Sequence, residues 1–204
     1  MEKTFSVVDQ PNKSFDDDFL GIDSHAQALT NFIKQCSTPL TIGIQGEWGS
    51  GKTSMLNSIS NKLGSDCYKI ITINAWEQAL LSKPEETLIK IVNEIINDLT
   101  SDLKASDQLK SQVTNNFKQI AKGALRIASA TAGGVATSQV VDELLTTNQN
   151  IINDLKKQLE QGTNEIIVKQ KKYKKIIIYV DDLDRIDPPE AVAVLELLKN
   201  IFDI

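Results

Sequence analysis

A glycine-rich turn that ends in a lysine and a threonine is the stretch of this sequence best suited to chemistry. Residues 46–54 read GEWGSGKTS and match the pattern G-x-x-x-x-G-K-[ST] completely. Such a turn binds a triphosphate, because its backbone N–H groups converge on the phosphates and its glycines keep side chains out of the way. We therefore predict a phosphate-binding loop made of Gly46, Glu47, Trp48, Gly49, Ser50, Gly51, Lys52, Thr53 and Ser54.

Two side chains of this loop have specific predicted roles. Lys52 is expected to reach the β- and γ-phosphates, and the Thr53 hydroxyl is expected to be a ligand of Mg²⁺. The alternative is a glycine-rich turn with an incidental lysine. The flanking residues disfavour it, because the apolar run at 41–45 predicts a buried strand and residues 54–63 predict a helix with one apolar face. Strand, loop and helix follow in the order that the motif requires.

A second candidate site follows the most apolar short run in the chain, IIIYV at 176–180. Such a run predicts a strand covered on both faces, as in a parallel sheet, where ligand sites lie at the carboxyl ends of strands. We therefore expect Asp181 to emerge where the phosphate-binding loop emerges and to bind Mg²⁺ with Thr53, directly or through a water. Asp182 takes the place where many P-loop enzymes carry a glutamate that orients and deprotonates the attacking water.

The acids after this strand have a plainer alternative. DDLDR at 181–185 is also compatible with a polar turn that ends the strand before a helix started by Asp187-Pro188-Pro189-Glu190. The role of Arg185 is open between sensing a γ-phosphate or a neighbouring subunit and an ion pair with Asp184 or Asp187.

Apolar periodicity predicts the other elements of the core. A helix with Asp23 or Ser24 as its N-cap precedes the loop, and its apolar stripe is Leu29, Phe32 and Ile33. A strand at 68–74 follows the loop helix, and a helix then begins at Ser82-Lys83-Pro84-Glu85 and carries Leu88, Ile91, Ile95 and Leu99.

The residues between the two motifs lack a convincing strand. Polar, periodic helices are expected at 103–122 and 147–160. The predicted fold is therefore α/β, a P-loop domain whose parallel sheet is flanked by helices, with a long all-helical insertion between the motifs. We divide it into a core part at 1–100 with the loop, the insertion at 101–172, and the second strand and its helix at 173–204.

Composition and charge narrow the function classes. The 204 residues are 41% hydrophobic, which is enough for one domain with a core, and the net charge of −5 gives nucleic-acid binding no support. The KKYKK cluster at 171–175 and the acids Asp16–Asp18 are expected to be solvated. Two distant cysteines and an N-terminus without a basic-then-apolar signal pattern favour the cytoplasm.

Residues 123–141 are the one candidate for a membrane span. They are rich in Ala, Gly, Ser and Thr, hold few large apolar side chains, and carry Arg126 and Gln139. A span needs about 20 strongly apolar residues, and an arginine at its centre costs about 3 kcal/mol. Close helix packing, within the chain or against a partner, is the favoured interpretation.

With both motifs in view, the sequence resembles the KAP family of P-loop NTPases. The resemblance rests on GEWGSGKTS at 46–54, on NAW at 74–76 and on IIIYVDDLDR at 176–185, and it covers nearly the whole chain. It implies an additional-strand P-loop core that hydrolyses ATP or another NTP with Mg²⁺. Many members carry membrane helices between the two motifs, whereas this chain looks like a soluble member. Some bacterial members are associated with exclusion of phage, which suggests host defence as the setting.

The resemblance also raises an expectation about the end of the chain. In this class of fold, the strand after the second motif's helix lies between the two motif strands and ends in a polar sensor residue. The chain stops at Ile204. We therefore expect a fragment, a truncated product or a core whose missing strands come from elsewhere, with weak or absent hydrolysis.

Three functions are compatible with these features. The first is NTP hydrolysis, with Lys52 and Asp182 as catalytic residues, that drives a conformational change in an attached module or a protein partner. The second is a scaffold that binds nucleotide without hydrolysing it and uses the insertion helices for a partner or for self-association. The third is a nucleic-acid-stimulated motor, which the acidic balance weakens.

Overall fold

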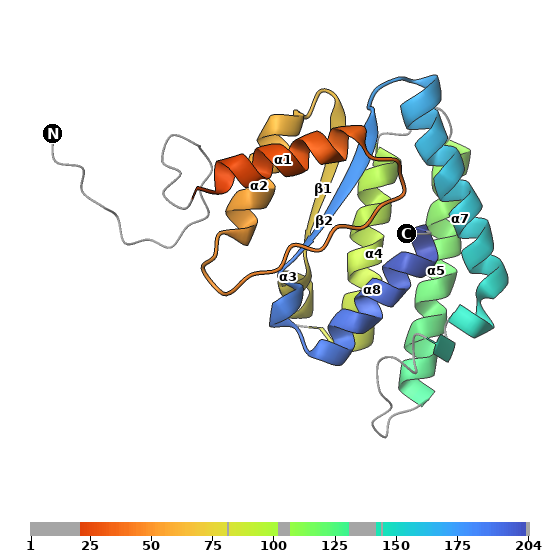
Figure 1. The fold of residues 1–204 in the computed structure, drawn as a ribbon. Coiled ribbons are helices and arrows are strands. Elements are labelled where there is room, and N and C mark those ends of the chain that lie inside the picture. Colours follow the sequence, from red (N-terminus) through yellow and green to blue (C-terminus); the bar gives the residue numbers. More distant parts are fainter. Residues whose placement is uncertain (1–20, 81, 102–106, 131–141, 144, 203–204) are drawn as a thin grey trace, which may run out of the picture. The chain divides into compact units, whose positions relative to one another are not determined.

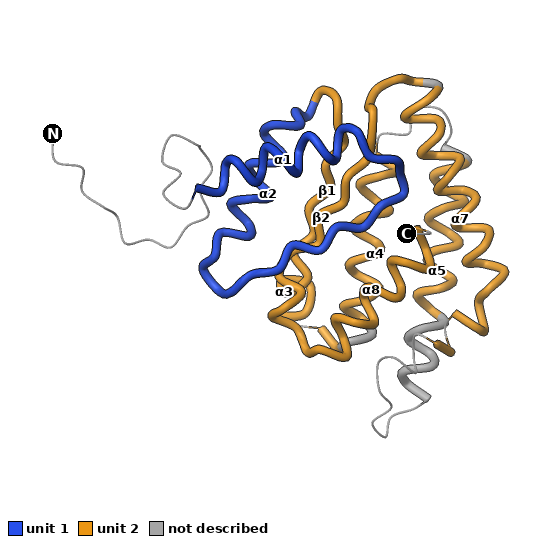
Figure 2. The backbone as a smooth tube through the Cα atoms, viewed as in Figure 1, with its two compact units in different colours: residues 1–65 blue, residues 66–204 orange. Residues whose placement is uncertain are grey.

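The computed structural model describes residues 21–80, 82–101, 107–130, 142–143 and 145–202 of this chain (Figure 1). The predicted cluster Asp16–Asp18 and residues 131–141 of the candidate span lie outside them. The chain divides into two compact units at Ser65, one of residues 1–65 and one of residues 66–204 (Figure 2).

The first unit consists of two packed helices and the loop that joins them. Helix α1 (Ile22–Gln35) packs against helix α2 (Lys52–Leu63). Its buried positions are Ala26, Thr30 and Ile33, which follow the i, i+4, i+7 spacing of one helix face. Phe32 was predicted to lie in this stripe but is 51% exposed, because it falls beside that face.

Helix α1 begins two or three residues earlier than predicted. Its N-cap is Gly21 in the left-handed region (φ 66°), and not Asp23 or Ser24. Asp23 instead joins the two helices, because its carboxylate accepts a bond from Lys62 Nζ (2.9 Å) and lies 3.4 Å from the Ser58 hydroxyl, which donates to it. The ion pair of Asp23 with Lys62 thus adds to the apolar packing of α1 against α2.

The strand predicted at 41–45 is not formed. These residues have no assigned secondary structure, and Ile42 is 38% exposed. A strand exists only with a hydrogen-bonded neighbour. The two strands that the structure describes pair with each other, so this segment has no ladder partner in the described part of the chain.

The second unit is built on two parallel strands, β1 (Tyr68–Asn74) and β2 (Lys175–Asp181). Both strands lie where the apolar runs predicted them, and their pairing confirms the parallel sheet. The register sets Tyr68 against Lys175 at one end and Asn74 against Asp181 at the other. The two carboxyl ends therefore coincide.

Helices cover this strand pair. The segment from β1 to β2 holds α3 (Ala75–Ala79), α4 (Pro84–Ser101), α5 (Asp107–Ala130), α7 (Gln149–Asn164) and a π-helical turn (Glu165–Lys169). A 3-10 turn (Leu183–Arg185) and α8 (Pro188–Phe202) follow β2. No described helix is long and apolar enough to span a membrane.

One core joins the strands and the four long helices. Helix α4 packs on β1 and contacts α5, α7 and α8, and α7 also contacts both α5 and α8 (Figure 1). The four α4 residues predicted to form its apolar face are all buried. Helices α5 and α7, which lie between β1 and β2 in sequence, contribute to the same core through Val113, Phe117, Ile120, Ile152, Leu155 and Leu159.

Strand β2 is less enclosed than predicted. Of its seven residues only Tyr179 is buried, and the others are half-buried. Ile176, Ile178 and Val180 alternate along the strand and pack against the helical core. The side chains of β2 are thus less buried than predicted, and β2 has a single strand neighbour among the described residues.

The core predicts a sharp contrast between two substitutions of large aliphatic residues by alanine. Ile95 in α4 is fully buried, so Ile95→Ala should lower the free energy of unfolding by about 2–5 kcal/mol, since it removes apolar contacts and leaves a cavity. Leu195→Ala in α8 is the control, because Leu195 is 49% exposed, and it should cost less than about 1 kcal/mol. Denaturant unfolding measures both, and equal losses would contradict the assigned core.

Candidate functional site

The phosphate-binding loop in the first unit has the backbone that its glycines permit. Gly49 and Gly51 adopt positive φ angles of 74° and 85°, which glycine reaches without strain. A Cβ at Gly46 would lie 2.5 Å from the Ser50 hydroxyl oxygen, so the Ser50 side chain would have to shift to admit one. The Ser50 N–H donates to the Glu47 carbonyl at 3.2 Å and closes a turn within the loop.

Lys52 bends back over this loop. Its ammonium group donates to the carbonyl oxygens of Gly46 (3.0 Å) and Glu47 (3.3 Å). The two bonds place a positive charge beside the loop backbone, at the position where a phosphate group is expected. Trp48 lies at the tip of the loop and is 70% exposed.

The loop ends at the N-terminus of α2. Gly51 is the N-cap, and Lys52, Thr53 and Ser54 form the first helical turn. The first N–H groups of a helix have no partner within it and carry partial positive charge, so they favour an anion. The first turn of α2 contains no acidic residue, and Lys52 adds a full positive charge. The predicted loop residues thus form one continuous segment whose charge and helix N-terminus would suit an anion.

The second motif lies in the other unit, at the carboxyl end of β2. Asp181 is the last strand residue, and its Oδ1 accepts a bond from the Asp182 N–H at 2.9 Å. Asp182 has a positive φ of 58°, a conformation that aspartate tolerates better than most residues. The chain turns sharply here, and the Arg185 N–H donates to the Asp182 carbonyl at 3.2 Å.

Asp182 is held by side chains from two elements. Asn74 at the end of β1 donates through Nδ2 to Asp182 Oδ2 at 2.9 Å, and Arg185 Nε lies 2.8 Å from Asp182 Oδ1. The Asp182 side chain is only 13% exposed. The Arg185 guanidinium also stacks on Trp76, with 5.3 Å between its central carbon and the ring centroid. Arg185 therefore forms an ion pair with Asp182, an acid that the alternatives considered from the sequence did not include.

The structure thus gives the two predicted groups of site residues separately. Residues 46–54 form one loop in the first unit, and Asp181 and Asp182 stand side by side in the second. The joint binding of Mg²⁺ by Thr53 and Asp181 stays a prediction from the order of strands and motifs. Their hydroxyl and carboxylate oxygens are the ligand type that Mg²⁺ prefers. Among the described residues, no three His, Cys, Asp or Glu side chains gather into a metal cluster of their own.

Sequence reasoning missed the contact of Asn74 with Asp182. Asn74 was named only as part of the NAW segment that supports the family resemblance, without a role of its own. A polar residue at the end of the strand next to Asp181 was the available signal, but the neighbour relation depends on a pairing across 108 residues of sequence.

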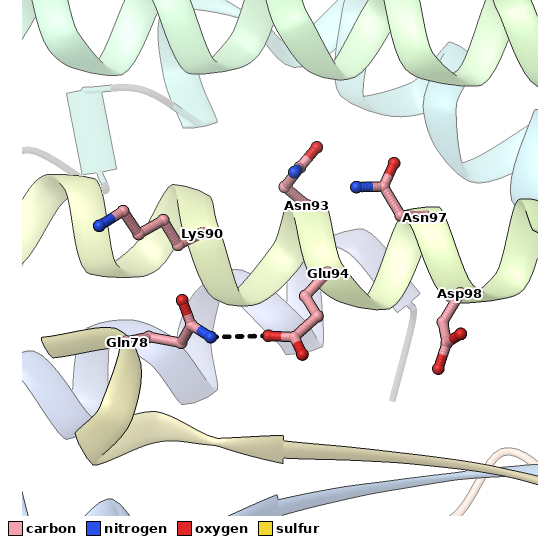
Figure 3. A pocket seen from close by; sticks show the side chains of 6 residues that line it. All are labelled: Gln78, Lys90, Asn93, Glu94, Asn97 and Asp98. Carbon is pink, nitrogen blue, oxygen red and sulfur yellow. Dashed lines mark hydrogen bonds between the residues drawn. The ribbon is translucent and has the colours of Figure 1, made fainter.

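A polar pocket of about 550 Å³ lies elsewhere in the second unit, along α4 (Figure 3). Its lining residues are Gln78, Lys90, Asn93, Glu94, Asn97 and Asp98. Gln78 Nε2 donates to Glu94 Oε2 at 2.8 Å. Desolvation, followed by the negative charges of Asp98 and Glu77, raises the pKa of Glu94 above its ordinary value of 4.5.

The loop at 46–54 has the sequence pattern of a P-loop domain. The chain belongs to the KAP family, since the family model of the KAP P-loop domain matches residues 22–204. The resemblance inferred from the three sequence segments is thereby confirmed. No curated protein and no solved structure matches the chain.

The raised pKa of Glu94 predicts a pH-dependent effect of its charge. The folded state holds this proton more tightly than the unfolded state. The contribution of Glu94 to stability is therefore greatest well below pH 4.5, and it is lost as the pH rises through the folded-state pKa. Glu94→Gln should therefore raise Tm by about 1 °C at neutral pH, and this gain should vanish in acid.

Thermal unfolding at the two pH values measures this effect. Glu196→Gln, on the exposed face of α8, removes the same charge away from the pocket and is the control. A Glu94→Gln variant that melts at or below the wild-type temperature at neutral pH would contradict the assignment.

Proposed function

We propose that this chain binds ATP, or another NTP, with Mg²⁺ and hydrolyses it. The observation that carries the proposal is the position of Lys52, whose ammonium lies on the carbonyl oxygens of Gly46 and Glu47 at the N-terminus of α2. One segment thus combines a lysine, the N–H groups of a helix N-terminus and a glycine backbone, which together suit an anion. Membership of a P-loop NTPase family supports the same ligand class.

The roles of the residues in this proposal follow from their chemistry. Lys52 neutralises the β- and γ-phosphates, and the loop amides bind the phosphate oxygens. Thr53 and Asp181 are the proposed ligands of Mg²⁺, which supplies charge neutralisation on the phosphates when bound. Asp182 orients the attacking water and accepts its proton. The rate enhancement would come from positioning and electrostatic stabilisation.

We further propose that turnover changes the conformation of an attached module or partner. Asp182 is bonded to Asn74, Asn74 caps α3, and α3 packs on α4. A change at the carboxylate therefore has a physical route to the helical layer. Exclusion of phage is the biological setting suggested by the family resemblance.

Removal of the Lys52 charge should abolish nucleotide binding. Lys52→Ala deletes the only side-chain cation of the loop, so ATP affinity should fall at least about a hundredfold, or about 3 kcal/mol. Isothermal titration calorimetry with Mg-ATP measures the affinity.

Lys62→Ala is the matched control, because Lys62 lies in the last turn of the same helix and pairs with Asp23. It should lower stability while ATP affinity stays near wild type. Unchanged ATP affinity in Lys52→Ala would show that the phosphates do not bind at this loop.

Loss of the Asp182 charge should separate binding from turnover. Asp182→Asn keeps the size of the side chain but removes the acceptor for the proton of water, so phosphate release should fall about a hundredfold or more while ATP affinity stays near wild type. Single-turnover phosphate release measures the rate. Binding without turnover in both wild type and Asp182→Asn would favour the scaffold over the enzyme.

A further inference from the structure

We propose that Asn74 is the positioning residue for Asp182 and sets the direction in which that carboxylate meets the attacking water. This inference rests on the proposed hydrolysis and adds a residue that it does not contain. Asn74 belongs to β1 and lies 108 residues before Asp182 in sequence, so only the pairing of β1 with β2 brings the two side chains together.

The contacts of the Asp182 carboxylate leave it little freedom. Oδ2 accepts the Asn74 amide at 2.9 Å, and Oδ1 is 2.8 Å from Arg185 Nε. One donor on each oxygen fixes both side-chain torsions of the aspartate. A carboxylate offers about four acceptor positions, so each oxygen can still accept a proton from water.

The orientation of Asn74 is itself determined. Its Oδ1 accepts the Glu77 N–H at 3.0 Å and so caps α3. Because a backbone N–H can only donate, the oxygen of the Asn74 amide must face α3, and the NH₂ group must face Asp182. A flipped amide would lose both bonds. The cap of α3 thereby directs the donor at Asp182.

The position of Asp182 in the chain explains why such a guide is needed. An aspartate is one methylene shorter than the glutamate common at this place in P-loop enzymes. Fewer orientations of its carboxylate can therefore reach the attacking water. Asp182 also lies in a left-handed turn, where the strand no longer fixes it.

Trp76, two residues after Asn74, supports the second contact. Its ring packs against the Arg185 guanidinium, which pairs with Asp182 Oδ1. The segment 74–76 therefore acts on both carboxylate oxygens, on Oδ2 through Asn74 and on Oδ1 through Arg185.

Asn74→Ser is the substitution that isolates this role. Serine is as good an N-cap as asparagine, so the start of α3 is retained, but its hydroxyl is too short to reach Asp182 and adds no charge. We expect kcat for ATP to fall about tenfold, the loss typical when a residue that orients a functional group is removed. KM, the calorimetric Kd for ATP and Tm should stay near wild type.

Two further variants complete the test. Asn200→Ser makes the same substitution in α8, where the side-chain amide donates to the Glu196 carbonyl at 2.8 Å, so it is the matched control and should leave kcat unchanged. Asn74→Asp also keeps the cap but sets a carboxylate against Asp182. Its kcat should fall further than that of Asn74→Ser.

The outcomes separate this inference from the proposed function. If wild type and Asn200→Ser hydrolyse ATP, Asp182→Asn does not, and Asn74→Ser keeps or raises its kcat, the positioning role is wrong and the hydrolytic role of Asp182 stands. A lower kcat of Asn74→Ser that comes with a lower Tm would also overturn the positioning role, since Asn74 would then act only through the stability of the fold. Absence of hydrolysis in wild type would overturn both.

Discussion

The second unit depends on the parallel pairing of β1 with β2. The register sets Asn74 against Asp181, so both strands deliver polar residues to the same edge. Parallel strands require a crossover, and here the crossover contains α3, α4, α5 and α7. Burial of α4 on β1, and of α5, α7 and α8 around α4, stabilises the strand pair that could not stand alone in water.

The two adjacent aspartates at the end of β2 have different surroundings, which suits them to different tasks. Asp181 turns one oxygen to the N–H of its own neighbour, whereas Asp182 accepts donors from β1 and from the following turn. The carboxylate of Asp181 thus bonds locally at the end of the strand, whereas that of the next residue, Asp182, links two elements. The proposal assigns the metal to the first and the water to the second.

Local sequence pattern was sufficient for the elements that carry strong periodicity. Strands at 68–74 and 175–181 and the helices α2, α4 and α8 follow directly from apolar runs, caps and the loop glycines. Predictions from the sequence pattern were wrong where contacts with other elements determine the structure. The run at 41–45 has strand-forming residues but no ladder partner among the described residues, and Phe32 is apolar yet lies off the face that contacts α2.

The site residues named from the sequence stay a prediction. The residue types of the loop and of the Asp181-Asp182 pair follow from phosphate and Mg²⁺ chemistry, so sequence alone could name them. The link from Asn74 to Asp182 could not be read in this way, because it depends on the register of two strands far apart in sequence. The ion pair of Arg185 with Asp182 was likewise not among the alternatives considered, since several acids lie within three residues of it along the chain.

The central claim is that the loop at 46–54 and the aspartates after β2 serve the same nucleotide. Paramagnetic broadening of backbone NMR signals by Mn²⁺, bound with ATP in place of Mg²⁺, tests it most directly. The account predicts strong broadening of the Thr53 signal and of the Asp181 and Asp182 signals in one titration, with Glu196 in α8 unaffected. Broadening confined to residues 46–54, with Asp181 and Asp182 unchanged, would contradict the account.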